Sequence, residues 1–199
     1  DWIGLGQLEQ ASLRLPQGSC QQQADLERQL NPLRYGELFG QAGAAAGLDP
    51  ALLQAVARQE SRFTAGVESP VGAVGLMQLM PDTARELAGR RLEAASLKDP
   101  ALNSRLGARY LRQLLEQWQG NPVLAVASYN AGPGAVAHWL KAGLGSDSPK
   151  PAGATIRLQR DPELWIEAIP YPETRLYTKK VLGNLWSYRR LNQGAGSGC

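Results

Sequence analysis

The chain has 199 residues, 43% of them hydrophobic, and is long enough for one domain with a sizeable buried core. Its formal net charge of +3 suits an anionic polymer, but no basic run is interleaved with aromatic residues, so we expect no nucleic-acid partner. No run of about 20 apolar residues occurs, so we expect no integral membrane segment. The two cysteines, Cys20 and Cys199, form no CxxC pair, and we expect no zinc or redox site.

Composition divides the chain into three parts. Residues 1–36 are polar and glutamine-rich and are expected to be a lead-in segment. Residues 37–191 are expected to form the folded domain, and residues 192–199 a tail. In an exported protein the two cysteines could be joined by a disulfide; otherwise we expect both to be dispensable, and the sequence leaves the choice open.

The first strong helix signal is Asp49-Pro50, an N-cap acceptor followed by proline at the first helical position. This helix is predicted to end near Ser61. It is followed by a glycine-rich stretch, residues 66–81, in which apolar residues alternate too little to predict a sheet. We therefore expect at most a small β element.

Helical patterns continue to the end of the domain. Further helices are predicted over residues 81–89, 101–118, 122–131, a short segment that contains His138 and Trp139, 162–169 and 172–190. The last of these places Tyr177, Val181, Leu185 and Tyr188 on one face. Residues 143–155 are rich in Gly, Ser, Pro and Lys and are predicted to be a loop. The pattern indicates a mainly α domain of many short helices.

Glu60 is the first candidate for chemistry. Helical spacing puts it on the face marked by Leu53, Val56 and Ala57, which is the buried stripe of its helix. Burial and the nearby helix C-terminus both disfavour a carboxylate and raise its pKa, as a proton donor near neutral pH requires. Two other interpretations fit the same pattern: a structural pair with a nearby arginine such as Arg62, or a helix end turned to solvent.

Four motifs occur in order along the chain. They are Glu60-Ser61, SPVGAVGLMQLMP at 69–81, SYNAGPG at 128–134 and EAIPYPETR at 167–175. Together with DPALN at 99–103 and LGARYL at 106–111, they resemble the catalytic domain of soluble lytic transglycosylases, relatives of goose-type lysozyme. The resemblance covers roughly residues 39–191. It implies a mainly α (α+β lysozyme-like) fold of short helices around a saccharide-binding groove, although the 143–155 loop is longer than the family's usual connection.

The resemblance also implies roles for particular residues. Glu60 matches the catalytic acid/base. The residues that match groove positions are Ser69, Gln78, Met80, Tyr129, Asn130 and Glu167. Each has a structural alternative: a turn residue for Ser69 and Asn130, a satisfied loop amide for Gln78, and a core side chain for Met80.

Two of these matches make a geometric claim. Tyr129 matches a tyrosine whose hydroxyl lies near the catalytic carboxyl, where it could donate a hydrogen bond; otherwise it is a half-buried tyrosine at a helix end. Glu167 matches a glutamate placed across the groove. The helical pattern instead puts Glu167 beside Glu163 on a polar, solvated face, and the motif is given precedence.

By resemblance, the activity is cleavage of the MurNAc–GlcNAc β-1,4 bond of peptidoglycan, with Glu60 as the sole acid/base and a 1,6-anhydromuramoyl end as product. No cofactor and no metal are implied. We expect a monomer that acts on glycan strands in the periplasm or cell envelope. The alternatives are a goose-type hydrolase, with Glu68 or Asp82 placing a water, and a non-catalytic wall-binding module. Asp82 fits a helix N-cap better than a catalytic role.

Overall fold

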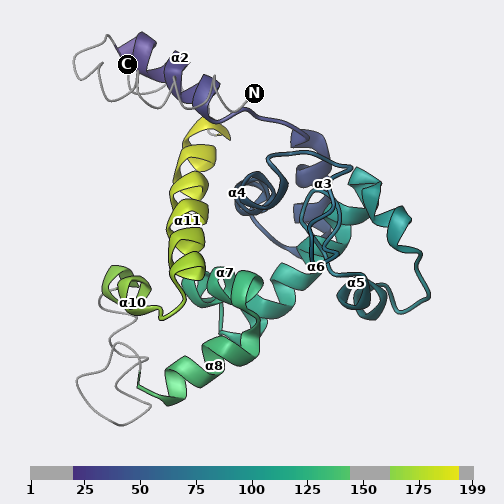
Figure 1. Ribbon diagram of the computed structural model, residues 1–199. Helices are drawn as coiled ribbons and strands as arrows, with labels where there is room; N and C mark the ends of the chain where they lie inside the picture. The colour runs from purple at the N-terminus through teal and green to yellow at the C-terminus, as the bar shows by residue number, and fades with distance from the viewer. Residues whose placement is uncertain (1–19, 144–161, 193–199) are drawn as a thin grey trace.

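The computed structural model describes residues 20–143 and 162–192, and these are mostly helical (Figure 1). The helices are α2 (Cys20–Leu30), α3 (Gly36–Ala46), α4 (Pro50–Ser61), α5 (Pro81–Ala88), the 3₁₀ helix η1 (Ala94–Lys98), α6 (Pro100–Gln117), α7 (Pro122–Ala131), α8 (Pro133–Lys141), α10 (Pro162–Ala168) and α11 (Pro172–Asn192). Within the described ranges, β pairing is confined to isolated bridges that join Glu68 to Val74 and Val74 to Leu79. The expectation of a mainly α fold with at most a small β element is confirmed.

Proline and short polar caps determine where the helices begin. α4, α5, α6, α7 and α8 each have proline in the first turn, where a missing N–H costs no hydrogen bond. Asp49, Asp99 and Asn121 each accept the backbone N–H two residues further on, at 2.9–3.0 Å. The predicted helix over 50–61 therefore has the bounds that the sequence indicated.

Three local features differ from the sequence-based expectations. α2 lies inside the segment expected to be a lead-in; its Gln, Leu, Glu and Arg residues have good helix propensity without a clear apolar stripe. The 3₁₀ helix η1 was also not predicted from the sequence pattern. The expectation that Asp82 caps α5 is wrong, because Pro81 starts the helix and leaves the cap position to Met80. Asp82 instead lies in the first turn of α5 and forms an ion pair with Arg85, three residues further on.

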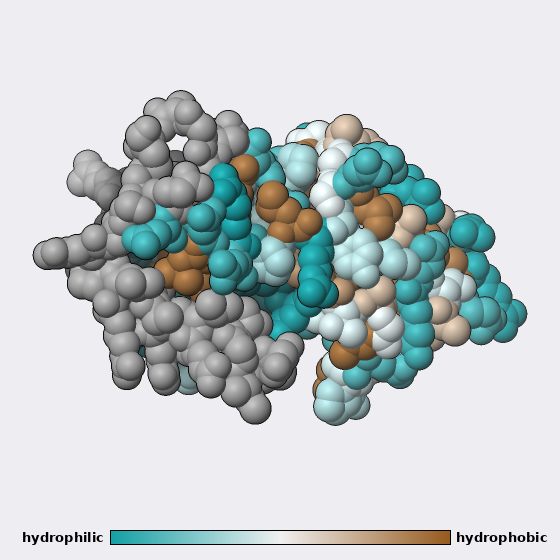
Figure 2. Space-filling view, turned by 90° about the horizontal axis from the view of Figure 1, so that it is seen from above, coloured by the Kyte–Doolittle hydropathy of each residue, from teal (hydrophilic) through white to brown (hydrophobic). Residues whose placement is uncertain are grey.

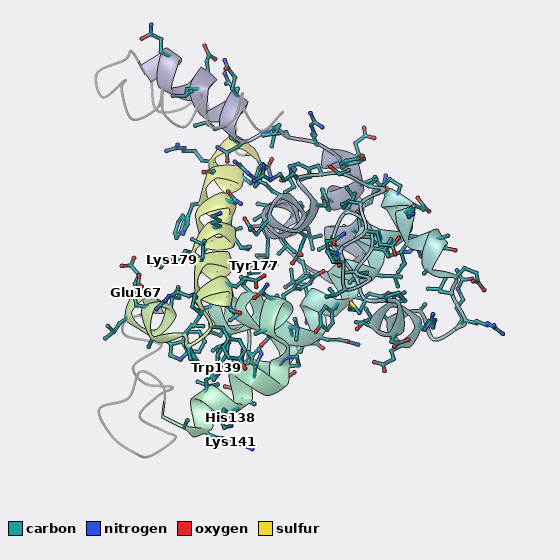
Figure 3. All side chains as sticks on the ribbon, in the orientation of Figure 1. His138, Trp139, Lys141, Glu167, Tyr177 and Lys179 are labelled. Atoms are coloured by element: carbon teal, nitrogen blue, oxygen red, sulfur yellow. The ribbon has the colours of Figure 1, made fainter. Side chains whose placement is uncertain are left out.

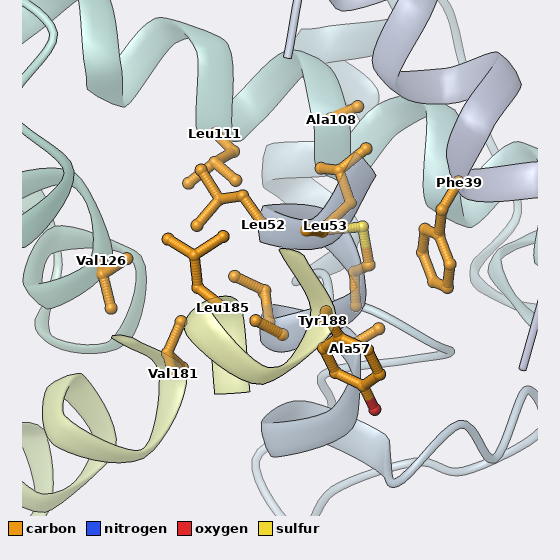
Figure 4. Close-up of a cluster of buried hydrophobic side chains, with 14 of the residues drawn as sticks. Phe39, Leu52, Leu53, Ala57, Ala108, Leu111, Val126, Val181, Leu185 and Tyr188 are labelled. Carbon is orange, nitrogen blue, oxygen red and sulfur yellow. The ribbon is translucent and has the colours of Figure 1, made fainter. Parts of the chain in front are cut away.

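α4 is the central helix of the domain. All residues from 51 to 57, including the polar Gln54, are buried, so this part of the helix is covered on every side and not only along the predicted stripe. It packs most extensively against α11 and also against α3 and α6. Figure 4 shows Leu52, Leu53 and Ala57 of α4 among side chains of the surrounding helices, including Leu185 and Tyr188 of α11. The predicted buried face of the last helix is confirmed.

Two smaller clusters complete the core. One joins α7, α8 and α10 around Trp139 and Trp165, and the other packs residues 74 and 79 with α5 against α6. Seen from above, apolar residues at the surface form small separate patches among hydrophilic ones (Figure 2). Among the described helices, none has an apolar stretch long enough to cross a bilayer. Most of the predicted 143–155 loop and Cys199 lie outside the described residues, so that loop and a Cys20–Cys199 disulfide remain predictions, as do the domain boundaries.

Candidate active site

Glu60 stands in the last turn of α4, where the central helix reaches the surface. The phenol of Tyr177 in α11 donates a hydrogen bond to Glu60 Oε1 at 2.6 Å. In Figure 3, Tyr177 lies on the side of α11 that faces α4. Because the two residues are far apart in sequence, this contact exists only where α11 packs along the central helix.

The surroundings of Glu60 raise the pKa of its carboxyl from 4.5 to about 7. Burial is the main cause, because removing water disfavours the charged form. The hydrogen bond from Tyr177 acts in the opposite direction, and the negative charge of Glu173 raises the pKa further. Near neutral pH, the carboxyl is therefore present in both its acid and its base form, and either form is available for proton transfer.

The two tyrosines near this carboxyl have different hydrogen bonds. Burial, followed by the charge of Glu60, raises the pKa of both Tyr129 and Tyr177 well above the usual value, so both are neutral donors at physiological pH. Tyr177 donates to Glu60, whereas Tyr129 donates to the backbone carbonyl of Met77 at 2.9 Å. Tyr129 is thus close enough to feel the charge of Glu60, but the hydrogen bond expected of it is made by Tyr177.

Side chains from three helices hold the segment 74–77 beside this site. Ser61, the neighbour of Glu60, donates to the carbonyl of Leu76 at 2.7 Å. The fully buried Asn103 of α6 accepts the N–H of Met77 at 2.7 Å and donates to the carbonyl of Val74 at 2.8 Å. With the Tyr129 bond from α7, these contacts fix the segment relative to Glu60, because they pair backbone groups of the loop with side chains of the surrounding helices.

A glycine makes this close approach possible. At Gly75, with φ of +86°, a Cβ would come within 2.3 Å of both Asn103 Nδ2 and the carbonyl oxygen of Leu97. Any larger residue would also be strained by the positive φ. Gly75 therefore allows this loop to pack tightly against α6 and η1 in one fixed conformation.

The three loop residues that were predicted to line a groove differ in their hydrogen bonds and in their exposure to solvent. Ser69 Oγ accepts the N–H of Ala73 at 3.0 Å, as the turn interpretation predicted. The amide nitrogen of Gln78 donates to the carbonyls of Val67 and Gly75 at 3.2 and 3.0 Å, which secures its own loop. Met80 is 44% exposed, which excludes the alternative of a core methionine.

Asn130 connects α7 to the start of α11. Its side-chain oxygen accepts a hydrogen bond from the hydroxyl of Thr174 at 2.6 Å. Thr174 lies in the first turn of α11, next to Glu173, whose charge acts on Glu60. Asn130 thus belongs to the border of the site through this contact.

The structure does not bring Glu167 close to Glu60. Glu167 is exposed and forms an ion pair with Lys179. Lys179 follows Tyr177 by two residues and therefore points about 200° away from it around α11. Figure 3 accordingly shows Glu167 and Lys179 on one side of α11 and Tyr177 on the other. The helical pattern, which indicated a solvated Glu167, describes its surroundings better than the motif did.

Sequence reasoning missed two residues of the site, Tyr177 and Glu173. Tyr177 was assigned to the buried face of the last helix. Because a buried phenol needs a hydrogen-bond partner, this position could have predicted that Tyr177 bonds a polar group inside the domain. Glu173 lies within the EAIPYPETR motif, six residues after the glutamate that was chosen from it. Neither the motif nor the helical period shows which of the two carboxylates acts on Glu60.

The other acidic residues considered for a second catalytic role are exposed. Glu68 lies 3.7 Å from Lys98, and Asp82 is paired with Arg85. Neither contributes to the raised pKa of Glu60. Among residues 20–143 and 162–192, no group of three or more His, Cys, Asp or Glu side chains is arranged to hold a metal ion.

A central helix that ends in a partly buried glutamate with a pKa of about 7, beside a phenol donor, defines a candidate acid/base site. The model of the transglycosylase SLT domain family matches residues 37–147, more than half of the chain, and the chain belongs to this family.

Individual relatives agree with this assignment. The soluble lytic murein transglycosylase of Escherichia coli (strain K12) is 36% identical over 163 residues, which are 79% of this chain and 23% of the relative. The structure of the 70 kDa soluble lytic transglycosylase from Escherichia coli superimposes with a TM-score of 0.73 at 34% identity, over 85% of this chain and 26% of that one.

A structure of an inactive glutamate-to-glutamine mutant of the lytic transglycosylase Slt from Pseudomonas aeruginosa has a TM-score of 0.70 at 39% identity, over 83% of this chain and 25% of that one. The chain thus spans about a quarter of the length of these relatives. The lysozyme-like, mainly α fold expected from the sequence motifs is confirmed.

Proposed function

We propose that this chain is a lytic transglycosylase domain that cleaves the MurNAc–GlcNAc β-1,4 bond of peptidoglycan and leaves 1,6-anhydromuramoyl ends. The observation that carries the proposal is the single carboxyl of Glu60, with its pKa near 7, bonded to the Tyr177 phenol in a member of the SLT family. The names of the relatives support the same activity.

In the first step, protonated Glu60 gives its proton to the glycosidic oxygen. The bond between that oxygen and C1 of MurNAc breaks, and its electron pair stays on the leaving GlcNAc oxygen. In the second step, the C6 hydroxyl of the same MurNAc attacks C1, and the Glu60 carboxylate accepts the hydroxyl proton. No water is consumed, and Glu60 returns to its starting state, so one carboxyl serves both steps.

The surroundings of Glu60 suit both halves of this cycle. Burial and the Glu173 charge favour the acid form that donates, while the Tyr177 hydrogen bond stabilises the carboxylate formed afterwards. These opposing effects leave the pKa of the carboxyl close to neutral. In this scheme, Tyr177 is a positioning residue and Glu60 the catalytic residue.

We assign the predicted substrate contacts to the residues around this carboxyl. Exposed Met80 supplies an apolar surface, and the side-chain oxygen of Gln78 remains for the glycan, since its nitrogen serves the loop. Tyr129 and Asn130 border the site through their bonds to Met77 and Thr174, and Ser69 lies in the adjoining turn. Glu167, on the opposite side of α11, would meet the strand only away from the cleaved bond.

A hydrolase of the goose-type class would need a second group to place water. The two carboxylates considered for that role are exposed, and the acid whose charge does reach Glu60 is Glu173. A binding-only module has no need of a carboxyl tuned to neutral pH. We therefore place the domain among the lyases of the periplasm or cell envelope, acting as a monomer on glycan strands.

The products of digestion test this function. Purified sacculi digested in ¹⁸O water should yield muropeptides that lack the mass of one water relative to reducing ends and that carry no ¹⁸O label. Labelled reducing ends would identify a hydrolase, and Glu173 would then be the first candidate to position the water. Absence of any released muropeptide would contradict the proposal of an active enzyme.

A further inference from the structure

Tyr171 is an exposed aromatic residue with a fixed backbone. It lies between Pro170 and Pro172, and the residue before a proline is confined to extended conformations. Its carbonyl accepts the N–H of Arg175 at 2.9 Å, which starts the first turn of α11. Despite this anchoring, 53% of the residue is exposed.

The orientation of the Tyr171 ring is also fixed, by a contact with a buried aromatic residue. It packs against Trp139 of α8 with ring centroids 5.1 Å apart and an angle of 82° between the ring planes, an edge-to-face pair. Trp139 is only 4% exposed and belongs to the core cluster of α7, α8 and α10. No hydrogen bond joins the Tyr171 hydroxyl to another part of the chain that the structure describes. Tyr171 therefore presents a rigid aromatic surface and an available hydroxyl to solvent.

The first turn of α11 borders the candidate active site. Glu173 in this turn acts on the pKa of Glu60, and Thr174 binds Asn130 at the end of α7. Tyr171 immediately precedes the turn, about 9 Å along the helix axis from Tyr177, which binds Glu60. This separation places Tyr171 beyond the Glu60–Tyr177 contact, where it would meet a sugar further along the same strand.

We infer that Tyr171 is the platform of a separate saccharide subsite, on which a pyranose ring of the glycan strand stacks. A pyranose ring has a face of C–H groups and a rim of hydroxyl and amide groups. The tyrosine offers a matching combination, an apolar ring with a polar tip at little conformational cost. This subsite rests on the proposed function, which supplies the glycan strand as ligand.

Such a subsite has a characteristic kinetic effect. Its contact with a sugar remote from the reacting bond is the same before and during the reaction, so it strengthens binding without changing the chemical step. It matters only for substrates long enough to reach it. Removal of the aromatic ring should raise KM for long strands, leave kcat unchanged, and have no effect on the shortest cleavable strands.

The matched variants are Tyr171→Ala, Tyr171→Phe and Trp186→Ala. Trp186 is 70% exposed and lies about 20 Å further along α11, so it controls for loss of any exposed aromatic ring. With purified GlcNAc–MurNAc strands of graded length, Tyr171→Ala should raise KM about tenfold for long strands alone. Tyr171→Phe should retain most of the affinity, and Trp186→Ala should behave as the wild type. An unchanged KM for Tyr171→Ala, an equal loss on short and long strands, or the same loss in Trp186→Ala would overturn the subsite.

Binding measured in the Glu60→Gln background separates this inference from the proposed activity. Titration of soluble glycan strands into Glu60→Gln and into Glu60→Gln/Tyr171→Ala should give a dissociation constant about tenfold larger for the double variant. Equal constants would overturn the subsite even if the enzyme is a transglycosylase. A tenfold difference would support the subsite even if the released muropeptides showed a different reaction.

Discussion

A carboxyl with a pKa of about 7 is half protonated at neutral pH, so Glu60 could act as acid and base within one cycle. Glu60→Gln keeps the size and the hydrogen bond to Tyr177 but cannot transfer a proton. We expect peptidoglycan cleavage to fall by about 10²–10⁴-fold or more, because one group serves both steps. Released muropeptides are the measurement, and circular dichroism checks that the variant is folded. Near-normal turnover would remove Glu60 from the mechanism.

The Tyr177 hydroxyl gives the second residue-scale prediction. Its hydrogen bond lowers the pKa of Glu60, so Tyr177→Phe should raise that pKa above 7 and shift the pH profile of turnover to higher pH. Loss of one hydrogen bond to a charged group should also lower turnover roughly 10- to 100-fold.

Tyr188→Phe is the control for this shift, since the Tyr188 hydroxyl bonds the carbonyl of Pro32 and the side chain of Arg58, about 16 Å along α11 from Tyr177. It should change neither the profile nor the rate. A profile of Tyr177→Phe that overlays the wild type would show that the phenol does not tune the carboxyl.

The same residues show how far the sequence alone could locate the site. Glu60 could be predicted because its burial follows from local helical spacing with Val56 and Ala57. The pairing of Glu60 with Tyr177 could not, since it depends on how α11 crosses α4, and no local period encodes that crossing. The choice of Glu167 instead of Glu173 has the same origin: both carboxylates lie in one motif, and only the packed helices decide which one is close enough to act on Glu60.

At the scale of elements, the segment 74–77 is the most constrained part of the site. Its backbone is held by Ser61, Asn103 and Tyr129 from three different helices. Helix starts were predictable because proline and Asx caps act locally, as at Asp49. This loop was predictable only as glycine-rich and non-sheet, because its conformation is set by partners distant in sequence.

Asn103→Asp tests that constraint. The substitution puts an oxygen where the amide nitrogen now donates to the carbonyls of Val74 and Leu97, at 2.8 and 2.9 Å. We expect a loss of stability of about 1–3 kcal/mol from the unpaired buried groups, and a higher KM because Gln78 and Met80 follow the displaced segment. Urea denaturation and steady-state kinetics measure the two effects.

Ser104→Ala is the matched control for Asn103→Asp. Ser104 is the next residue of α6, is equally buried, and its hydroxyl has no hydrogen-bond partner among the residues that the structure describes. Its removal should leave KM unchanged and stability equal or slightly higher. If Asn103→Asp lowered stability while KM stayed at the wild-type value, Asn103 would support the fold without positioning the loop.

At the scale of the whole molecule, the central position of α4 links the site to folding stability. The helix is surrounded by α3, α6 and α11, and Glu60 lies at the end where this packing gives way to solvent. A carboxyl in that position is held in its acid form by the folded protein more strongly than by the unfolded chain. The sequence could predict the α4 helix with Glu60 on its buried stripe, and the buried face of α11. It could not predict the pH dependence of stability, because that depends on how the two helices pack together.

The free energy of unfolding should therefore depend on pH through Glu60. The pKa of Glu60 is about 7 in the folded protein and 4.5 when the side chain is exposed to water, as in the unfolded chain. Between these two pH values, the folded state therefore binds more protons than the unfolded state. The stabilisation is complete below about pH 4.5 and is lost as the pH rises to 7, by at most about 3 kcal/mol for this shift. Glu60→Gln has no proton to lose, so its stability relative to the wild type should increase from pH 5 to pH 8. Urea denaturation of both proteins at each pH measures this difference, from which the other titrating groups cancel. A difference that stays constant with pH, or that decreases, would show that the folded protein does not raise the pKa of Glu60.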